Sequence, residues 1–239
     1  MKNYEAKMHN THKIGGLLIA FALVACNSKP EVVEPTLETE CPQVASVKTK
    51  IVDSDLSGAN EDTITISVIG TLMPGDRGLL DVTTKLIDQA TLRDRPKVRI
   101  NIDSNGGALA QGLALRDAVK YYGEDHISIL CTTDASSAAS FLFATAARRY
   151  ALPSCGMITH AVSVAHDANV KPDLNMQRDF LKKENMGTQQ IRDIYRASLG
   201  LTEGCAMFLT RRSDTDLTAY DALKLGFFDA VLEPNGKMT

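Results

Sequence analysis

Hydrophobic and polar residues alternate along the chain with two different periods from about residue 50 onward. Short stretches rich in β-branched residues, such as Thr63–Gly70, have the period of two that is typical of a β-strand. Longer stretches, such as Leu79–Leu92, place apolar residues three and four positions apart, as on one face of a helix. Strands are predicted at 63–70, 97–102, 126–131, 150–151 and 157–160, and helices at 79–92, 108–121, 137–147, 174–199 and 219–225. This order predicts an α/β domain with a parallel sheet over residues 50–239.

One apolar segment lies outside this pattern, near the N-terminus. Ile14–Ala25 has twelve residues, whereas a membrane-spanning helix needs about 20. Its length and the positive flank of Lys2, Lys7 and Lys13 are typical of a secretory signal peptide. Residues 1–25 are therefore predicted to be a signal peptide that is removed from the mature protein.

The end of this segment, Leu23-Val24-Ala25-Cys26, resembles the lipobox of bacterial lipoproteins. The resemblance implies that Cys26 is lipidated, becomes the mature N-terminus and anchors an exported protein to a membrane. Asn27 after the cysteine implies the outer membrane if the cell is Gram-negative. Residues 26–49 are rich in Pro, Glu, Val and Thr, and this composition predicts a flexible tether between the lipid and the domain.

Composition and charge narrow the class of partner. The chain is 44% hydrophobic and 23% charged, which is typical of a globular protein. Its net charge is −3, aromatic residues make up 5% and Trp is absent, so no basic or stacking surface for nucleic acid is expected. Without residues 1–25 the chain has 23 basic and 28 acidic residues and a net charge of −5.

Four cysteines remain after the one predicted to carry lipid. An exported protein meets an oxidising compartment, where disulfides form. Four cysteines allow three pairings, and the sequence does not choose among them. For Cys131 and Cys155, two buried free thiols are an equal alternative. No Cys/His spacing predicts a metal site. The four are Cys41, Cys131, Cys155 and Cys205.

Three places carry residues suited to catalysis. Gly106-Gly107 lies between a predicted strand and a helix, where backbone N–H groups favour negative charge. Ser136–Ser140 follows the next strand and places hydroxyl groups at a helix start, although serine there is also an ordinary N-cap. His160 ends a predicted strand, and a histidine by itself is more often a partly buried polar residue. None of the three is decisive alone.

Together, in chain order, these segments resemble the Clp protease proteolytic subunit, a self-compartmentalising serine peptidase of the crotonase-like fold. The resemblance covers about residues 62–232. It implies repeated β-β-α units in a spiral and a protruding handle helix, which the predicted helix 174–199 would form. The matching segments are Ile102–Gly107, Asp134–Leu142, Leu152–His160 and Asp214–Asp229.

The resemblance also implies a role for each site residue. Ser137 would be the nucleophile, His160 the general base and Asp214 the carboxylate that orients the imidazole. The backbone N–H groups of Gly107 and Ala138 would form the oxyanion hole. No metal and no organic cofactor are needed.

Some of these assignments have alternatives within the motif. Ser136 and Ser140 are rivals for the nucleophile, because counting back from His160 falls near Ala135 rather than Ser137. Asp216 is the rival of Asp214. The chain also departs from the family, which has glycine at the positions of Thr133 and Ala139 and proline at that of Asn105, and a second histidine, His166, follows His160.

The expected function is therefore an exported, lipid-anchored serine endopeptidase that cleaves peptides or unfolded segments. Because ATP is not available outside the cytoplasm, cleavage is expected to be independent of ATP. A ring-shaped homo-oligomer is implied by the family. Three alternatives stay open: a catalytically silent assembly or binding module, acyl-CoA chemistry on the same fold, and a Ser/Lys dyad, which lacks a lysine between Lys120 and Lys171.

Overall fold

The computed structural model describes residues 35–41, 63–75, 77–91, 95–145, 148–165, 169 and 171–233. The predicted signal peptide, the predicted lipidation site Cys26 and His166 lie outside these residues. The chain divides into two units, Met1–Glu34 and Pro35–Thr239, and all described residues belong to the second.

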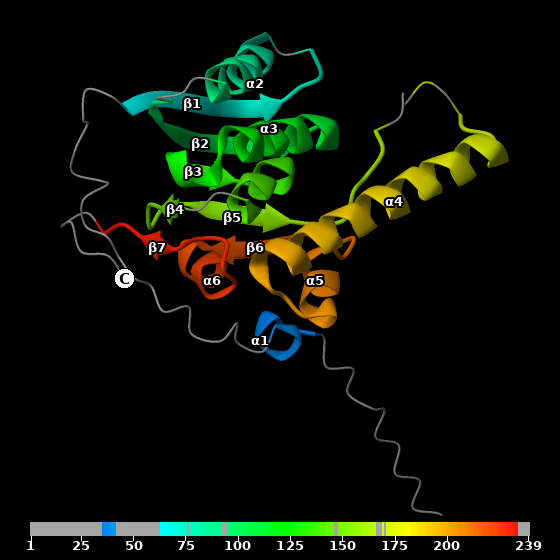
Figure 1. Ribbon diagram of the computed structural model, residues 1–239. Helices are drawn as coiled ribbons and strands as arrows, with labels where there is room; N and C mark the ends of the chain where they lie inside the picture. Colours follow the sequence, from blue (N-terminus) through cyan, green and yellow to red (C-terminus); the bar gives the residue numbers. More distant parts are fainter. Residues whose placement is uncertain are drawn as a thin grey trace, which may run out of the picture. The chain divides into compact units, whose positions relative to one another are not determined.

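The described residues contain a seven-stranded sheet in which parallel pairs predominate (Figure 1). Five strands lie in the order β1-β2-β3-β4-β7, and each neighbouring pair is parallel. β5 pairs with β3 in parallel and with β6 in antiparallel orientation. This confirms the predicted α/β class. The strands are β1 Thr63–Leu72, β2 Lys97–Gly107, β3 Ile127–Ala135, β4 Arg148–Ala151, β5 Gly156–Thr159, β6 Thr215–Thr218 and β7 Ala230–Val231.

The helices flank this sheet. α2 and α3 pack against each other beside β1 and β2 (Figure 1). No helix in the described part of the chain is long and apolar enough to cross a membrane. The helices are α1 Leu37–Glu40, α2 Arg77–Ala90, α3 Leu109–Tyr122, α4 Leu174–Leu199, α5 Glu203–Leu209 and α6 Ala219–Lys224, with short 3₁₀ helices η2 Glu124–His126 and η3 Ser137–Ala144.

α4 has the bounds that the sequence predicts, because both of its ends carry strong capping residues. The Asp173 side chain accepts a hydrogen bond of 2.8 Å from the N–H of Met176. Gly200 ends the helix with a φ of 68°, a left-handed conformation that glycine adopts without strain. The helix turns that precede Gly187 carry no buried residue and extend away from the sheet (Figure 1).

The core consists of alternate strand residues and of aromatic residues from the helices. Ile100 and Ile102 of β2 are buried, while the residues between them are partly exposed, as a half-buried strand requires. Phe143 of η3 packs edge-on against Phe228, with ring centroids 5.0 Å apart. η3 therefore lies against a well-packed core.

Several elements differ from the prediction in extent or kind. β2 continues to Gly107 and β3 to Ala135, beyond the predicted ends at residues 102 and 131. Both extensions carry polar residues, whose hydrogen bonds to neighbouring strands the apolar pattern does not reveal. The helix predicted at 137–147 is a 3₁₀ helix that ends at Ala144. α5 and β6 were not predicted, since each spans only about two periods of its pattern.

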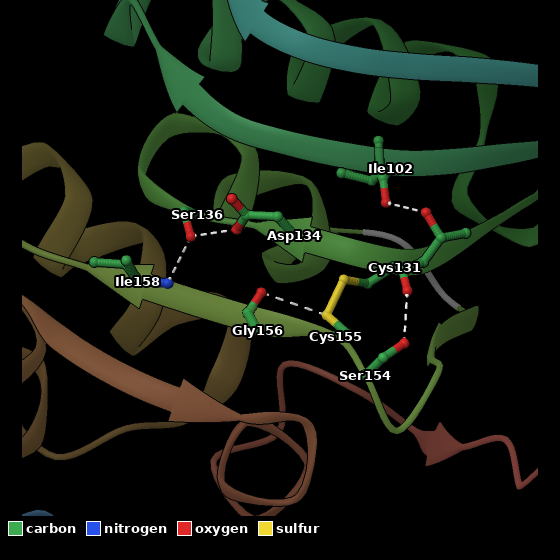
Figure 2. Close-up of a disulfide and its surroundings, with 9 residues drawn as sticks. Ile102, Cys131, Asp134, Ser136, Ser154, Cys155, Gly156 and Ile158 are labelled. Carbon is green, nitrogen blue, oxygen red and sulfur yellow. Dashed lines mark hydrogen bonds between the residues drawn. A yellow bond between two sulfur atoms is a disulfide. The ribbon is translucent and has the colours of Figure 1, made fainter.

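The four cysteines form two disulfides, one of the three possible pairings. The alternative of free thiols at Cys131 and Cys155 is wrong. Cys41 is bonded to Cys205, which lies 164 residues further along the chain. Cys131 is bonded to Cys155, 24 residues further along (Figure 2). The first disulfide attaches Pro35–Cys41 to α5, so this part of the predicted tether is fixed to the domain by a bond that composition alone does not predict.

Candidate active site

A cavity of about 770 Å³ brings together four of the five residues predicted for catalysis. Ser137 and Ala138 line it from the start of η3, His160 from the end of β5, and Gly107 from the end of β2. Most of the remaining lining is apolar. It comprises Met73, Pro74, Ala108, Leu109, Phe141, Val162, Ser163, Val164, Ala165, Ile191 and Tyr195.

Ser137 has an unusual backbone conformation. Its φ is 52°, and no other non-glycine residue in the described ranges has a positive φ. A left-handed residue with a Cβ costs about 1–2 kcal/mol, and such strain is concentrated at functional sites. The side chain is half-buried at the cavity, and its Oγ makes no hydrogen bond to another described residue. Ser137 is thus held in a strained turn with its hydroxyl free.

The glycine loop lies directly against this turn. A Cβ added at Gly106 would lie 2.6 Å from the Cβ of Ser137 and 2.8 Å from the backbone N of Ala138. At Gly107 a Cβ would lie 2.4 Å from the carbonyl oxygen of Leu72. Any side chain at either position would clash with its neighbours, so both positions require glycine. The glycine loop and the serine turn therefore pack directly against each other.

Ser104 joins this loop to its neighbours. Its Oγ donates to the carbonyl oxygen of Gly70 at 2.5 Å and accepts from the N–H of Gly106 at 3.2 Å. Its own carbonyl oxygen accepts from the N–H of Ser136 at 2.9 Å. The end of β2 is thereby fixed to β1 on one side and to the serine turn on the other.

The two rival serines have structural partners. The Oγ of Ser136 donates to the Asp134 carboxylate and accepts from the N–H of Ile158 at 2.9 Å (Figure 2). The Oγ of Ser140 is fully buried, donates to the carbonyl oxygen of Ser137 at 2.6 Å and lies 2.8 Å from the hydroxyl of Tyr195. Neither residue lines the cavity.

His160 is half-buried and follows the last residue of β5. Its Nδ1 lies 2.6 Å from the carbonyl oxygen of Ala161. Because a carbonyl oxygen only accepts, Nδ1 carries the proton, and Nε2 of the neutral imidazole is left as a proton acceptor. No hydrogen bond joins His160 to Ser137 in this structure, although both line one cavity. Catalytic hydrogen bonds are often longer in the absence of substrate.

Among the described residues no hydrogen bond or ion pair joins Asp214 to His160. Thr159 pairs with Thr215, and the N–H of Ala161 donates to the carbonyl oxygen of Arg211 at 2.8 Å. His160 therefore faces three exposed residues, 212–214, which form a bulge before β6. Within the described residues the Asp214 carboxylate has no hydrogen bond, and it does not line the cavity.

Its rival, Asp216, is exposed and pairs with Ile158 of β5. Among the described residues neither carboxylate forms a hydrogen bond with the imidazole.

The segment after His160 is held by α4, which sequence reasoning did not foresee. The side chain of Thr188 accepts from the N–H of Val162 at 3.0 Å, and Glu184 accepts from the N–H of Val164 at 3.1 Å. A Cβ at Gly187 would lie 3.0 Å from Val162. These residues occupy the helical positions 184, 187 and 188, and this small and polar face, which precedes the buried apolar residues of the helix, is the one signal the sequence offered.

The site offers no ligands for a metal ion. No group of three or more His, Cys, Asp or Glu residues lies together among the residues that the structure describes.

Tyr195 also lines the cavity. Burial raises the pKa of Tyr195, and the hydrogen bond to Ser140 lowers it by less. Tyr195 therefore acts as a neutral hydroxyl that packs against Phe227 and fixes η3.

Comparison with known proteins identifies the family. The profile of the Clp protease family matches residues 77–235. The chain is 28% identical over 164 residues to ATP-dependent Clp protease proteolytic subunit 2 of Mycobacterium leprae (strain TN), covering 66% of this chain and 73% of that protein. It is 27% identical over 164 residues to ATP-dependent Clp protease proteolytic subunit 1 of Rhodococcus jostii (strain RHA1), covering 66% and 70%.

The chain therefore belongs to the Clp protease family, and the ClpP/crotonase-like fold class predicted from the sequence is confirmed. The family consists of serine peptidases whose members form oligomeric rings, so a peptidase class and a homo-oligomer are both supported.

Proposed function

We propose that this protein is a serine endopeptidase with Ser137 as nucleophile and His160 as general base. The observation that carries the proposal is the left-handed backbone of Ser137, which presents a free hydroxyl to the cavity that His160 also lines. A strained backbone of this kind persists only where the contacts around it are strong enough to hold it in place. The engaged hydroxyls of Ser136 and Ser140 support the choice of Ser137 among the three.

In the proposed reaction His160 accepts the proton of Ser137 through Nε2 as the Oγ attacks the scissile carbonyl. The N–H groups of Gly107 and Ala138 then stabilise the negative charge on the carbonyl oxygen. Release of the amine leaves an acyl group on Ser137, and water removes it with the same histidine as base. No metal or organic cofactor is required.

Asp214 remains the proposed carboxylate of this site. In the described structure the carbonyl oxygen of Ala161 holds the imidazole proton instead. The bulge that contains Asp214 runs opposite His160 and is exposed, so a rearrangement on substrate binding would bring the carboxylate to Nδ1.

The lining of the cavity favours peptide substrates that insert an apolar side chain. Leu109, Phe141 and Ile191 surround the space next to the serine, and the lining carries no ionisable side chain apart from His160 and the neutral Tyr195. Burying an apolar side chain there gains about 25 cal/mol per Å² of apolar surface removed from water.

We also propose an exported, membrane-anchored location with lipid on Cys26. The two disulfides support it, because disulfides persist mainly in oxidising compartments. Hydrolysis of peptides and unfolded segments would then proceed without ATP.

The exposed half of α4 supports assembly into rings. Leu174, Leu181 and Met186 are 71%, 46% and 64% exposed on this extension. Apolar side chains of this size are expected to be covered by another copy of the chain.

A catalytically silent binding module is the second candidate. Two observations favour it: in the described residues Asp214 forms no hydrogen bond with His160, and the family's motif glycines are Thr133 and Ala139 here. In this case the protein would assemble through the same surfaces without an acyl-enzyme.

Labelling with a fluorophosphonate probe separates the two. The test uses the chain from Asn27 onward, which retains Cys41 and hence both disulfides. Labelling of the wild type that is abolished in Ser137→Ala and still detected in Ser136→Ala and Ser140→Ala, at whatever rate the altered hydrogen bonds leave, supports the peptidase. Labelling that persists in Ser137→Ala contradicts the assignment, and an unlabelled wild type that still forms rings favours the silent module.

A further inference from the structure

The Cys131–Cys155 disulfide joins the two segments that carry the proposed nucleophile and base. Cys131 lies in β3, six residues before Ser137, and Cys155 lies immediately before β5, five residues before His160. Both cysteines are buried, at 0% and 2% exposure, and neither lines the cavity. The disulfide therefore touches the catalytic groups only through the two strands.

The sheet itself joins these strands weakly. β3 pairs with β4 over four positions, from Ser128 to Cys131. Beyond Cys131 its partner becomes β5, and a single pair, Asp134 with Gly156, connects them. The disulfide lies where β3 changes partner. At this point backbone hydrogen bonding alone leaves the separation of β3 and β5 poorly determined.

Two side-chain hydrogen bonds reinforce the junction (Figure 2). The Oγ of Ser154 donates to the carbonyl oxygen of Thr132 at 3.1 Å. The N–H of Ile158 donates to Ser136 Oγ at 2.9 Å. Both hydrogen bonds use the short side chain of a serine, which cannot follow a moving partner. A small shift of β5 along β3 therefore breaks both bonds. Such a shift would move His160 relative to Ser137.

We propose that the Cys131–Cys155 disulfide is a positioning element that fixes the separation between Ser137 and His160, and that its reduction lowers catalysis without unfolding the domain. The inference rests on the proposed function. A displacement of about 1 Å can cost about 10²-fold in rate, so loss of one covalent link at this junction is sufficient for a large effect.

The redox step needs a dithiol reductant. Its thiolate attacks one sulfur of the Cys131–Cys155 bond, and its second thiol resolves the mixed disulfide. Two electrons and two protons pass to the protein, which gains two thiols, and the reductant leaves as its own disulfide. Because both sulfurs are buried, the bond is attacked only when β5 opens locally.

The matched comparison uses the other disulfide. Peptide hydrolysis and fluorophosphonate labelling are measured for Cys131→Ala/Cys155→Ala and for Cys41→Ala/Cys205→Ala, each checked for folding by circular dichroism. We expect kcat and the labelling rate to fall at least tenfold in the first variant, with KM within about threefold, and to stay within twofold of wild type in the second. Equal rates in the two variants, or global unfolding of the first, would overturn the proposal.

A reversible version uses the Cys41→Ala/Cys205→Ala variant, in which Cys131–Cys155 is the one remaining disulfide of the described domain. Reduction by a dithiol should lower the labelling rate at least tenfold, and reoxidation should restore it. A rate that reduction leaves unchanged speaks against the proposal.

A third measurement needs no activity. The imidazole resonances of His160 are recorded by NMR against pH, with and without Ser137→Ala. We expect the substitution to shift these resonances in the oxidised protein and to leave them unchanged after reduction. If oxidised wild type hydrolyses nothing but this dependence is seen, the peptidase proposal fails and the positioning role stands. The same response in both redox states overturns the positioning role.

Discussion

Gly106 and Ser137 are in such close contact that no side chain fits between them. A Cβ at Gly106 would lie 2.6 Å from the Cβ of Ser137, well inside van der Waals contact, and equally close to the carbonyl oxygen of Ser136. The φ of Gly106 is 87°, so an added Cβ would also strain its own backbone. The loop that precedes α3 and the turn that starts η3 must therefore move together.

Gly106→Ala is expected to displace the turn and to lower kcat by about 10²-fold or more, because catalysis depends on placement within about 1 Å. Steady-state hydrolysis of a fluorogenic peptide measures the loss. Gly204→Ala is the control, since a Cβ there meets nothing closer than 3.7 Å and lies within a helix. Near-wild-type activity in Gly106→Ala would contradict the tight packing described here.

Ser137→Gly should stabilise the fold while removing the nucleophile. Glycine relieves the left-handed strain, for a gain of about 1 kcal/mol over Ser137→Ala in the free energy of unfolding. Urea denaturation of the two variants measures this difference. Both variants should fail to react with a fluorophosphonate. If alanine were as stable as glycine at this position, the turn would not be strained.

Asp214→Ala tests which group orients the imidazole. Asp214 is proposed to replace the carbonyl oxygen of Ala161 at Nδ1–H when substrate binds, so we expect kcat to fall by about 10⁴-fold, the loss found where a carboxylate is essential to the tautomer. Asp216→Ala is the matched control and should stay within twofold. A loss below about 10²-fold at Asp214 would mean that the carbonyl oxygen of Ala161 keeps the imidazole proton during catalysis.

Alkaline pH should destabilise the fold through its buried tyrosines. Burial raises the pKa of Tyr195, and also that of Tyr122, where Arg95 acts in the opposite direction. In the unfolded chain the tyrosine hydroxyls ionise near pH 10, whereas in the folded chain they stay protonated. The free energy of unfolding therefore keeps its full value below pH 10 and falls above it, by up to about 1.4 kcal/mol per pH unit for each such tyrosine. Urea denaturation between pH 8 and 11 should give a shallower fall for Tyr195→Phe than for wild type. Identical slopes would contradict this account.

The two disulfides should differ in their contribution to stability. In the chain-entropy model a closed loop of 164 residues is worth about 5 kcal/mol and one of 24 residues about 3.5 kcal/mol. Cys41→Ala/Cys205→Ala is therefore expected to lower the melting temperature more than Cys131→Ala/Cys155→Ala. Calorimetry of the two double variants provides the comparison, and the reverse order would show that strain or residual structure dominates.

Long periodic elements were predictable from the sequence, and the fine geometry of the site was not. α4 was found at its observed bounds from its apolar stripe, and Asp173 and Gly200 cap the helix at those bounds. The extension of β3 to Ala135 and the short strand β6 depend on contacts between residues distant in the sequence. Local pattern contains no information on such contacts.

The candidate site shows the same division. The motifs led to Ser137, His160, Gly107 and Ala138, which line one cavity. They did not indicate that Nδ1 of His160 is held by the carbonyl oxygen of Ala161, because every residue has a carbonyl and none is distinctive. The bulge that contains Asp214 follows from a two-residue register difference opposite His160, which spacing along one chain does not reveal.

The bond between Cys41 and Cys205 has a practical outcome for handling the protein. A protease that cuts anywhere from residue 42 to residue 62 would produce two fragments that remain covalently joined. Such nicked material would migrate as a single species on a denaturing gel until a reducing agent is added, and only then release the shorter piece.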